Sequence, residues 1–170
     1  MNNGVYLIGS LRNPIVPKLG VALRELGYDV FDDWFGAGKE ADDEWQRYEQ
    51  VRGRTYPQAL AGHAAEHIFH FDKKHLDRCD TGVLVLPAGK SGHLELGYMI
   101  GQQKRSFILY HEEPERWDLM YKFADMVCFG EDALLEAIGP YHFNMIGSAI
   151  DHELERQREG NPTPYSFGRS

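Results

Sequence analysis

The 170-residue sequence is poor in several features that mark large classes of protein. It has only two cysteines, Cys79 and Cys128, in no CxxC spacing, which excludes a disulfide framework and indicates no cysteine-based metal or redox site. We expect both thiols to be reduced and buried. No apolar run approaches the roughly 18 residues of a membrane-spanning helix, and residues 1–10 lack the basic start of a secretory signal. The expected location is therefore the cytoplasm, without a membrane partner.

Positive charge is also scarce. The chain has 18 Lys and Arg against 26 Asp and Glu, for a formal net charge of -8. A polymeric nucleic acid is bound through a broad basic surface, so this composition argues against such a partner. A hydrophobic content of 42% in a chain of this length is typical of one globular domain.

Short apolar runs alternate with stretches of helical periodicity along the chain. The predicted strands are Val5–Ile8, Tyr28–Phe31, Thr81–Leu86, Ser106–Tyr110 and Met126–Phe129. The predicted helices are Leu19–Leu26, a charged helix within Lys39–Arg54, one long helix over Tyr56–Leu76, and then Ser91–Gln103, Pro114–Phe123 and Asp132–Ile138. This alternation indicates an α/β protein with a parallel sheet covered on both faces, in which Thr81–Leu86, the strongest predicted strand, is central.

Ligands of such sheets bind at the carboxyl ends of the strands, so the loops after the predicted strands are expected to converge on one crevice. The loop that follows Leu86 contains Gly89 and Gly92 and leads to Glu95, near the start of the next helix. Glu95 has two interpretations: a carboxylate stabilised by the helix dipole, or a partly desolvated nucleophile or base between apolar neighbours.

Three segments together resemble a known enzyme family. They are VYLIGS from Val5, FDKKHLDRCDTGVLVLP from Phe71 and SGHLELGYMIG from Ser91. They are similar to the nucleoside 2-deoxyribosyltransferases and to their relatives that hydrolyse N-glycosidic bonds of nucleotides. The resemblance covers residues 5–135. It implies a flavodoxin-like (Rossmann-like) three-layer sandwich with a five-stranded, mainly parallel sheet and a catalytic domain over residues 1–140. From their own apolar and charged stretches, residues 141–170 are expected to form a C-terminal helix and tail, either an oligomerisation arm or a frayed terminus.

The resemblance also implies catalytic roles. Glu95 matches the nucleophile that forms a glycosyl-enzyme intermediate, Asp72 the acid that assists the leaving base, and Tyr6 the phenol that steers the nucleophile. Breaking an N-glycosidic bond needs this combination, because one carboxylate must face the anomeric carbon while a proton donor reaches the base. Taken alone, Tyr6 is equally well a strand residue of the core, and Asp72 a solvated helix-end carboxylate. No metal and no cofactor is implied.

A wider set of residues is implied to bind the substrate: Gly9, Ser10, Arg12, Asp32, Gly89, Ser91, Gly92, His93, Asp118 and Met120. Ser10, Arg12 and Ser91 can hold a 5′-phosphate. Gly89 departs from the family, whose transferases have Asp and whose nucleotide hydrolases have Ser at this position, and the carboxylate of Asp118 would repel phosphate. Nucleoside and nucleoside 5′-monophosphate both stay open as substrates.

Other interpretations also stay open. His63–His67 spells HxxEH, the pattern of a zinc-protease helix, although a solvated His-rich helix face is favoured. The stretch PAGKSGHLE is loosely similar to the phosphoribohydrolases that activate cytokinins, and a nucleotide-sensing module or an NAD-cleaving signalling domain can share the fold. The segment Asp118–Met120 matches one that relatives insert across a subunit interface, and Phe143–Ile150 is apolar, so we expect a homodimer or a dimer-based oligomer.

Overall fold

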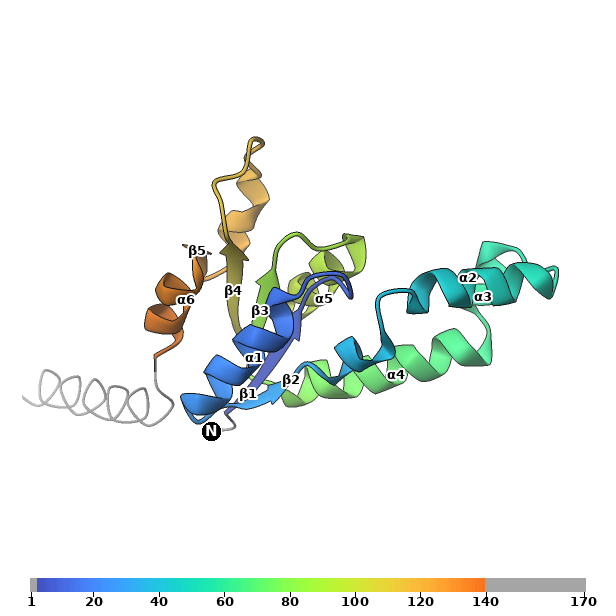
Figure 1. Cartoon of the computed structure of the whole chain (residues 1–170), viewed down its shortest axis with the longest axis horizontal. Helices are drawn as coiled ribbons and strands as arrows, with labels where there is room; N and C mark the ends of the chain where they lie inside the picture. Colours follow the sequence, from blue (N-terminus) through green and yellow to red (C-terminus); the bar gives the residue numbers. More distant parts are fainter. Residues whose placement is uncertain (1–2, 140–170) are drawn as a thin grey trace, which may run out of the picture.

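A five-stranded parallel sheet forms the centre of the protein, which we describe from a computed structural model over residues 3–139 (Figure 1). Its strands are β1 (Gly4–Ile8), β2 (Asp29–Phe31), β3 (Thr81–Val85), β4 (Arg105–Tyr110) and β5 (Met126–Phe129). The order is β2-β1-β3-β4-β5, and every neighbouring pair is parallel. This confirms the flavodoxin-like α/β fold with β3 at the centre. Over the described residues the sheet is wholly parallel rather than mainly so.

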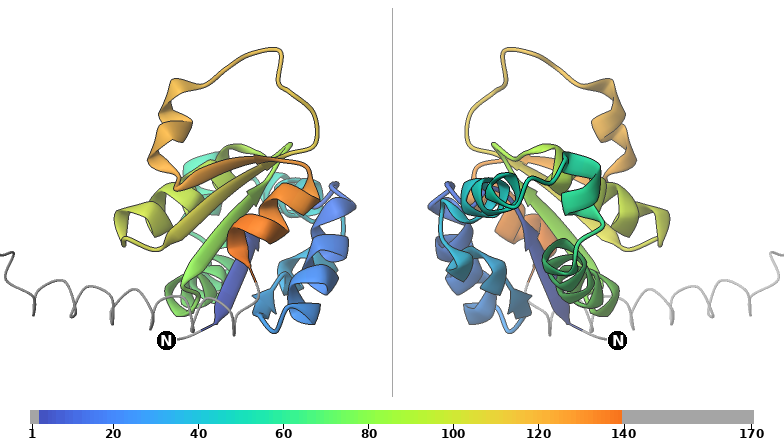
Figure 2. Two further views of the ribbon diagram at one scale, coloured as in Figure 1. Left: turned by 90° about the vertical axis from the view of Figure 1, so that its left-hand side faces the viewer. Right: turned by 90° about the vertical axis from the view of Figure 1, so that its right-hand side faces the viewer.

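Helices cover both faces of the sheet (Figure 2). On one face lie α1 (Ile15–Glu25) and α6 (Glu131–Ile138), and on the other α4 (His63–Arg78) and α5 (Lys90–Gly101). Two further helices, α2 (Ala41–Val51) and α3 (Tyr56–Leu60), lie beyond the sheet beside the N-terminal half of α4 (Figure 1). Two short 3-10 helices complete the described residues, η1 (Asp33–Ala37) and η2 (Leu119–Phe123).

The prediction of one long helix over Tyr56–Leu76 is wrong, because the chain breaks between α3 and α4. Gly62 at the break has an extended backbone and is buried. A Cβ atom there would lie 2.7 Å from the Arg54 guanidinium and 3.0 Å from the carbonyl oxygen of Ala59, so a larger residue would have to displace its neighbours. Thr55 begins α3 with a capping box to Gln58, which makes it a separate helix.

The prediction of a helix over Pro114–Phe123 is also wrong for its first half. Only the 3-10 helix η2 forms, and the Asp118 carboxylate begins it by accepting a hydrogen bond from the Met120 amide at 2.9 Å. A side chain that bonds its own backbone two residues on favours a turn at this position over a longer helix.

The pleat of β1 decides which side chains meet which helices. Val5 and Leu7 pack with α1 and α6, whereas Tyr6 and Ile8 pack on the opposite face, which α4 and α5 cover. Successive side chains of a strand point to opposite faces, so this alternation places Tyr6 toward α4 and α5. From β1, the face toward α1 and α6 thus receives only apolar side chains, whereas the face toward α4 and α5 also receives the polar phenol of Tyr6.

The structure confirms the prediction for the two cysteines. Cys79 and Cys128 are both free and buried, as predicted. Within residues 3–139, no helix is long and apolar enough to cross a membrane.

Candidate active site

Tyr6, Asp72 and Glu95, the three predicted catalytic residues, come together where β1, α4 and α5 meet. The negative charges of Glu95 and Asp72 both act on Tyr6, and the charge of Asp72 acts on Glu95. Tyr6 is almost fully buried and the two carboxylates are half-buried. The three groups therefore form one electrostatic cluster on the α4–α5 face of the sheet.

Burial shifts the protonation of every member of this cluster. Loss of water, and then the nearby charge of Asp72, raises the pKa of Glu95 to about 7. Burial likewise raises the pKa of Asp72. For Tyr6, burial and then the charges of Glu95 and Asp72 raise the pKa far above its usual range, so this phenol stays neutral and can donate a hydrogen bond. Near neutral pH the cluster thus holds one carboxyl group poised between its two forms.

Gly92 sets the distance between α5 and the sheet, and therefore the position of Glu95 one turn later. A Cβ atom on Gly92 would lie 3.0 Å from Ile8 and 3.2 Å from Leu84, so a larger residue would push the helix outward. Gly92 is buried and faces these strands. It was predicted to bind substrate; the packing gives it a positioning role, and the binding role stays a prediction.

The start of α5 borders an open cavity of about 560 Å³, lined by Ala88, Gly89, Lys90, His93 and Leu94. Gly89 begins the helix without a side-chain cap, and both Gly89 and Ser91 are exposed. A helix start of this kind leaves amide N–H groups for a polar ligand. The cavity is within the usual size range of small-ligand sites.

Asn13, which the sequence interpretation missed, fastens the loop after β1 to the loop after β3. This buried side chain donates to the carbonyl of Leu86 at 3.3 Å and accepts from the amide of Ile15 at 3.1 Å. The signal for it was an Asn directly before Pro14 at the start of a helix, a typical turn position. In the same loop, Ser10 accepts from the amide of Arg12 at 3.2 Å.

Gly9 ends β1 beside the ring of Trp34, another residue that the sequence interpretation did not select. A Cβ atom on Gly9 would lie 2.9 Å from Val16 and 3.7 Å from the Trp34 ring. The indole N–H of Trp34 donates to the carbonyl of Leu7 at 2.8 Å. Glycine is therefore required here by packing, and its predicted contact with substrate stays a prediction.

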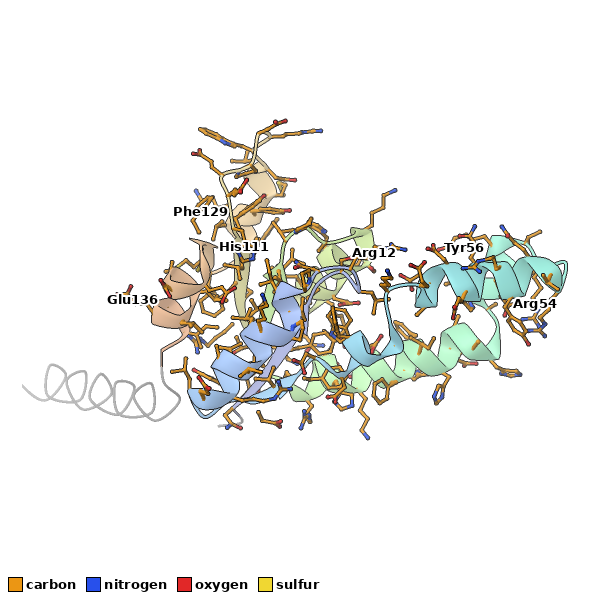
Figure 3. The ribbon with its side chains drawn as sticks, viewed as in Figure 1. Arg12, Arg54, Tyr56, His111, Phe129 and Glu136 are labelled. Atoms are coloured by element: carbon orange, nitrogen blue, oxygen red, sulfur yellow. The ribbon has the colours of Figure 1, made fainter. Side chains whose placement is uncertain are left out.

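Asp32 and Arg12, both predicted to bind substrate, form ion pairs within the chain. Asp32 binds the guanidinium of Arg24 on α1, with one contact at 3.2 Å. Arg12 donates to Asp43 on α2 at 2.7 Å, with Glu40 at 3.8 Å (Figure 3). The structure does not bring either side chain into the charge cluster of Tyr6, so their binding roles stay predictions.

His93 joins the start of α5 to η2. Its Nδ1–H donates to the carbonyl of Gly89 at 2.8 Å, and in the neutral ring Nε2 accepts from the hydroxyl of Tyr121 at 2.7 Å. Tyr121 was not among the predicted site residues. Its only signal in the sequence is its position directly after Asp118–Met120, the segment expected at a subunit interface. Because both ring nitrogens of His93 have partners in the chain, a direct contact with substrate would require one of these bonds to open.

The segment around η2 exposes large apolar side chains. Trp117, Leu119, Met120 and Phe123 have exposed fractions of 78%, 82%, 59% and 66%, and Phe129 on the edge strand β5 is exposed as well (Figure 3). Asp118 lies among them, also exposed. The preceding loop and η2 protrude from the carboxyl end of β4 (Figure 1). Neither Asp118 nor Met120 contributes to the charge cluster within one chain.

The HxxEH motif lies on the first two turns of α4. His63 and His70 each lie 3.8 Å from Glu66, and all three side chains are exposed. Within residues 3–139, no group of three or more His, Cys, Asp or Glu side chains is arranged to hold a metal ion. The motif thus forms a solvent-exposed helix face.

Comparison with known proteins gives structural matches only. No family model and no curated protein sequence matches the chain. A conserved protein from Enterococcus faecalis V583 is 16% identical, with a TM-score of 0.55, over 81% of this chain and 98% of that one. The CMP N-glycosidase BcmB from Clostridium botulinum is 14% identical, with a TM-score of 0.45, over 79% and 97% of the two chains. The match to the Enterococcus faecalis protein, at low sequence identity, shows a shared fold.

The buried position of Glu95 predicts that Glu95→Gln stabilises the folded protein at pH 8 and much less at pH 5. Its pKa is 4.5 in the unfolded chain and about 7 in the fold, so between these values the unfolded state binds fewer protons and stability falls as pH rises. The difference corresponds to at most about 3 kcal/mol. Urea unfolding at both pH values measures it, with exposed Glu136→Gln as the control; a Glu95 variant less stable than wild type at pH 8 would contradict it.

Proposed function

We propose that the protein is an N-glycosidic-bond enzyme that cleaves or transfers the (deoxy)ribosyl group of a nucleoside or nucleoside 5′-monophosphate. The observation that carries this proposal is the cluster of two half-buried carboxylates and a buried phenol between β1, α4 and α5. The motif resemblance selects the same three residues independently of their position in space. Glu95 is the nucleophile in this proposal, Asp72 the acid and Tyr6 the group that orients Glu95.

In the first step, the ionised carboxylate of Glu95 attacks the anomeric carbon. The bond from this carbon to the base nitrogen breaks, its electron pair leaves with the base, and the proton of Asp72 neutralises the leaving group. In the second step, water or an acceptor base attacks the anomeric carbon of the glycosyl ester. The bond from this carbon to the Glu95 oxygen breaks, its electron pair returns to the Glu95 carboxylate, and the Asp72 carboxylate takes the proton of the attacking group. Hydrolysis and transfer differ only in this acceptor.

The electrostatics of the cluster favour ionisation of Asp72 before Glu95, because the charge of Asp72 is one cause of the raised pKa of Glu95. The reactive form, with Glu95 ionised and Asp72 protonated, is therefore the minor arrangement of the one proton that the pair shares near neutral pH. Burial weakens the hydration of the Glu95 carboxylate, which makes the ionised form a stronger nucleophile. The raised pKa of Asp72 lets it keep its proton at a higher pH than an ordinary Asp does. The neutral phenol of Tyr6 can donate to Glu95 without adding charge. Two interacting carboxyl groups titrate as a pair, so the pH profile is expected to report both.

Glu95→Ala is expected to lower turnover at least about a thousandfold, or about 4 kcal/mol in the barrier, because the covalent intermediate cannot form. Release of free base from a panel of nucleosides and nucleotides, followed by mass spectrometry, measures it. Glu136→Ala, exposed on α6, is the matched control (Figure 3). Ligand-induced stabilisation without any base release would instead support a nucleotide-sensing module, and a near-normal rate in Glu95→Ala would remove the nucleophile assignment.

Asp72→Asn is expected to slow natural substrates much more than a glycoside with an activated aryl leaving group, which needs no proton. The same variant should move the acidic limb of the kcat/KM profile to lower pH, since the charge of Asp72 is one cause of the raised pKa of Glu95. Rates on both substrate types between pH 5 and 9 test both effects. Equal losses on the two substrates together with an unmoved limb would assign Asp72 a structural role.

The assembly that we propose is a homodimer or a dimer-based oligomer. The exposed apolar side chains around η2 support it, because large apolar patches on a surface mark interaction sites. Light scattering should give a mass of at least twice 19.5 kDa at assay concentration. Trp117→Ser combined with Leu119→Ser should shift the protein toward monomer and reduce activity. A fully active wild-type monomer would exclude a site shared between subunits.

A further inference from the structure

Arg12 is the cation of the first loop that a substrate phosphate would need, and two carboxylates already hold it. Its guanidinium donates to Asp43 at 2.7 Å and lies 3.8 Å from Glu40. Both acids belong to the start of α2, where the helix dipole favours negative charge. The side chain of Arg12 therefore runs from the loop after β1 toward α2 (Figure 3).

The helix that carries these acids is closed at its C-terminal end by ion pairs of its own. Glu49, on the same helix, is 2% exposed and binds the guanidinium groups of Arg52 at 3.4 Å and Arg54 at 3.2 Å. A buried charge that is paired on both sides resists displacement, because losing a partner would leave it uncompensated. The carboxylates of Glu40 and Asp43 are thus presented to Arg12 from the start of a helix whose far end is closed by the ion pairs of Glu49.

The negative charge at the start of α2 opposes the binding of a phosphate to Arg12 more than the strength of the Arg12 ion pairs does. Arg12, Glu40 and Asp43 are all about half exposed, and such pairs are weak on their own. A phosphate that bound Arg12, however, would share one guanidinium with two carboxylates and would be repelled by both. Asp42 and Glu44 add further negative charge to the same turn of α2.

We propose that Glu40 and Asp43 are specificity-determining residues that hold Arg12 on α2 and so exclude a 5′-phosphate, which makes the site select nucleosides over nucleoside 5′-monophosphates. This inference rests on the proposed N-glycosidic function. Toward a phosphate it leaves the uncharged groups of Ser10, Ser91 and the amides at the start of α5, together with the exposed ammonium of Lys90, which borders the cavity there. It differs from the expectation that Arg12 itself binds the phosphate.

The test compares two double variants of the full chain that remove the same amount of charge. Glu40→Gln with Asp43→Asn frees Arg12, whereas Asp42→Asn with Glu44→Gln neutralises neighbouring acids that form no ion pair with Arg12 among the described residues. Each of the four common 2′-deoxynucleosides is assayed beside its own 5′-monophosphate. The readout is the ratio of kcat/KM for the monophosphate to kcat/KM for the nucleoside. A variant that is partly unfolded loses both values by the same factor, so its ratio does not change.

The wild-type ratio is expected to be below one. Freeing Arg12 should raise it ten- to a hundredfold, equivalent to about 1.4 to 2.8 kcal/mol, and adding Arg12→Ala to that variant should abolish the gain. The control double variant should change the ratio less than about threefold. A wild-type preference for the monophosphate, or equal effects of the two double variants, would overturn the inference.

A separate binding measurement distinguishes failure of this inference from failure of the proposed function. If no substrate releases base, the enzymatic proposal fails, and isothermal titration of the same nucleosides and monophosphates decides the inference. Tighter nucleoside binding by wild type, with a reversal when Arg12 is freed, supports the selection by Glu40 and Asp43. Tighter monophosphate binding by wild type, or binding of neither ligand, overturns it.

Discussion

The removal of two carboxylates and one phenol from water, at the junction of β1, α4 and α5, is the constraint on which the site depends. An isolated half-buried carboxylate favours its protonated form, and here the charge of a second one adds to this effect at Glu95. The arrangement opposes stability whenever Glu95 is ionised, so the surrounding fold must compensate. The apolar packing of β1 and β3 against α5 supplies this compensation, and Gly92 keeps the helix close enough for it.

The same two helices show how strongly surroundings decide what a carboxylate does. One turn and a half after Asp72, Asp77 is exposed and accepts from the ammonium of Lys73 and the hydroxyl of Tyr98, each at 2.6 Å. These hydrogen bonds lower the pKa of Asp77 to about 2, whereas burial raises the pKa of Asp72. Asp77 bonds α4 to α5 through Tyr98, so this ionised group fixes the helices that carry the reactive ones.

The sequence predicts the sheet well because its strands are short apolar runs whose burial on both faces needs no distant information. It predicts the meeting of Tyr6, Asp72 and Glu95 through motif resemblance, and the pleat of β1 explains it. Two kinds of feature are not predicted by the sequence. Gly62, at the break between α3 and α4, lies against the Arg54 guanidinium, and Arg12 turns to Asp43, 31 residues away. Both depend on tertiary neighbours, which periodicity does not contain.

One electrostatic field gives the proposed reaction and its proposed selectivity a common origin. The transition state of N-glycosidic cleavage carries positive charge on the sugar, so two carboxylates near the anomeric carbon stabilise it. The negative field that favours this cation disfavours an anion brought in on the same sugar. Glu40 and Asp43 neutralise the guanidinium of Arg12, the cation of the first loop, that would otherwise attract the anion. A site that accepted the 5′-phosphate would have to keep its carboxylates at the anomeric carbon and direct a cation to the 5′ end of the sugar. In this protein that cation is directed to α2, so the acidic character of the chain and the chemistry of Glu95 act in the same direction.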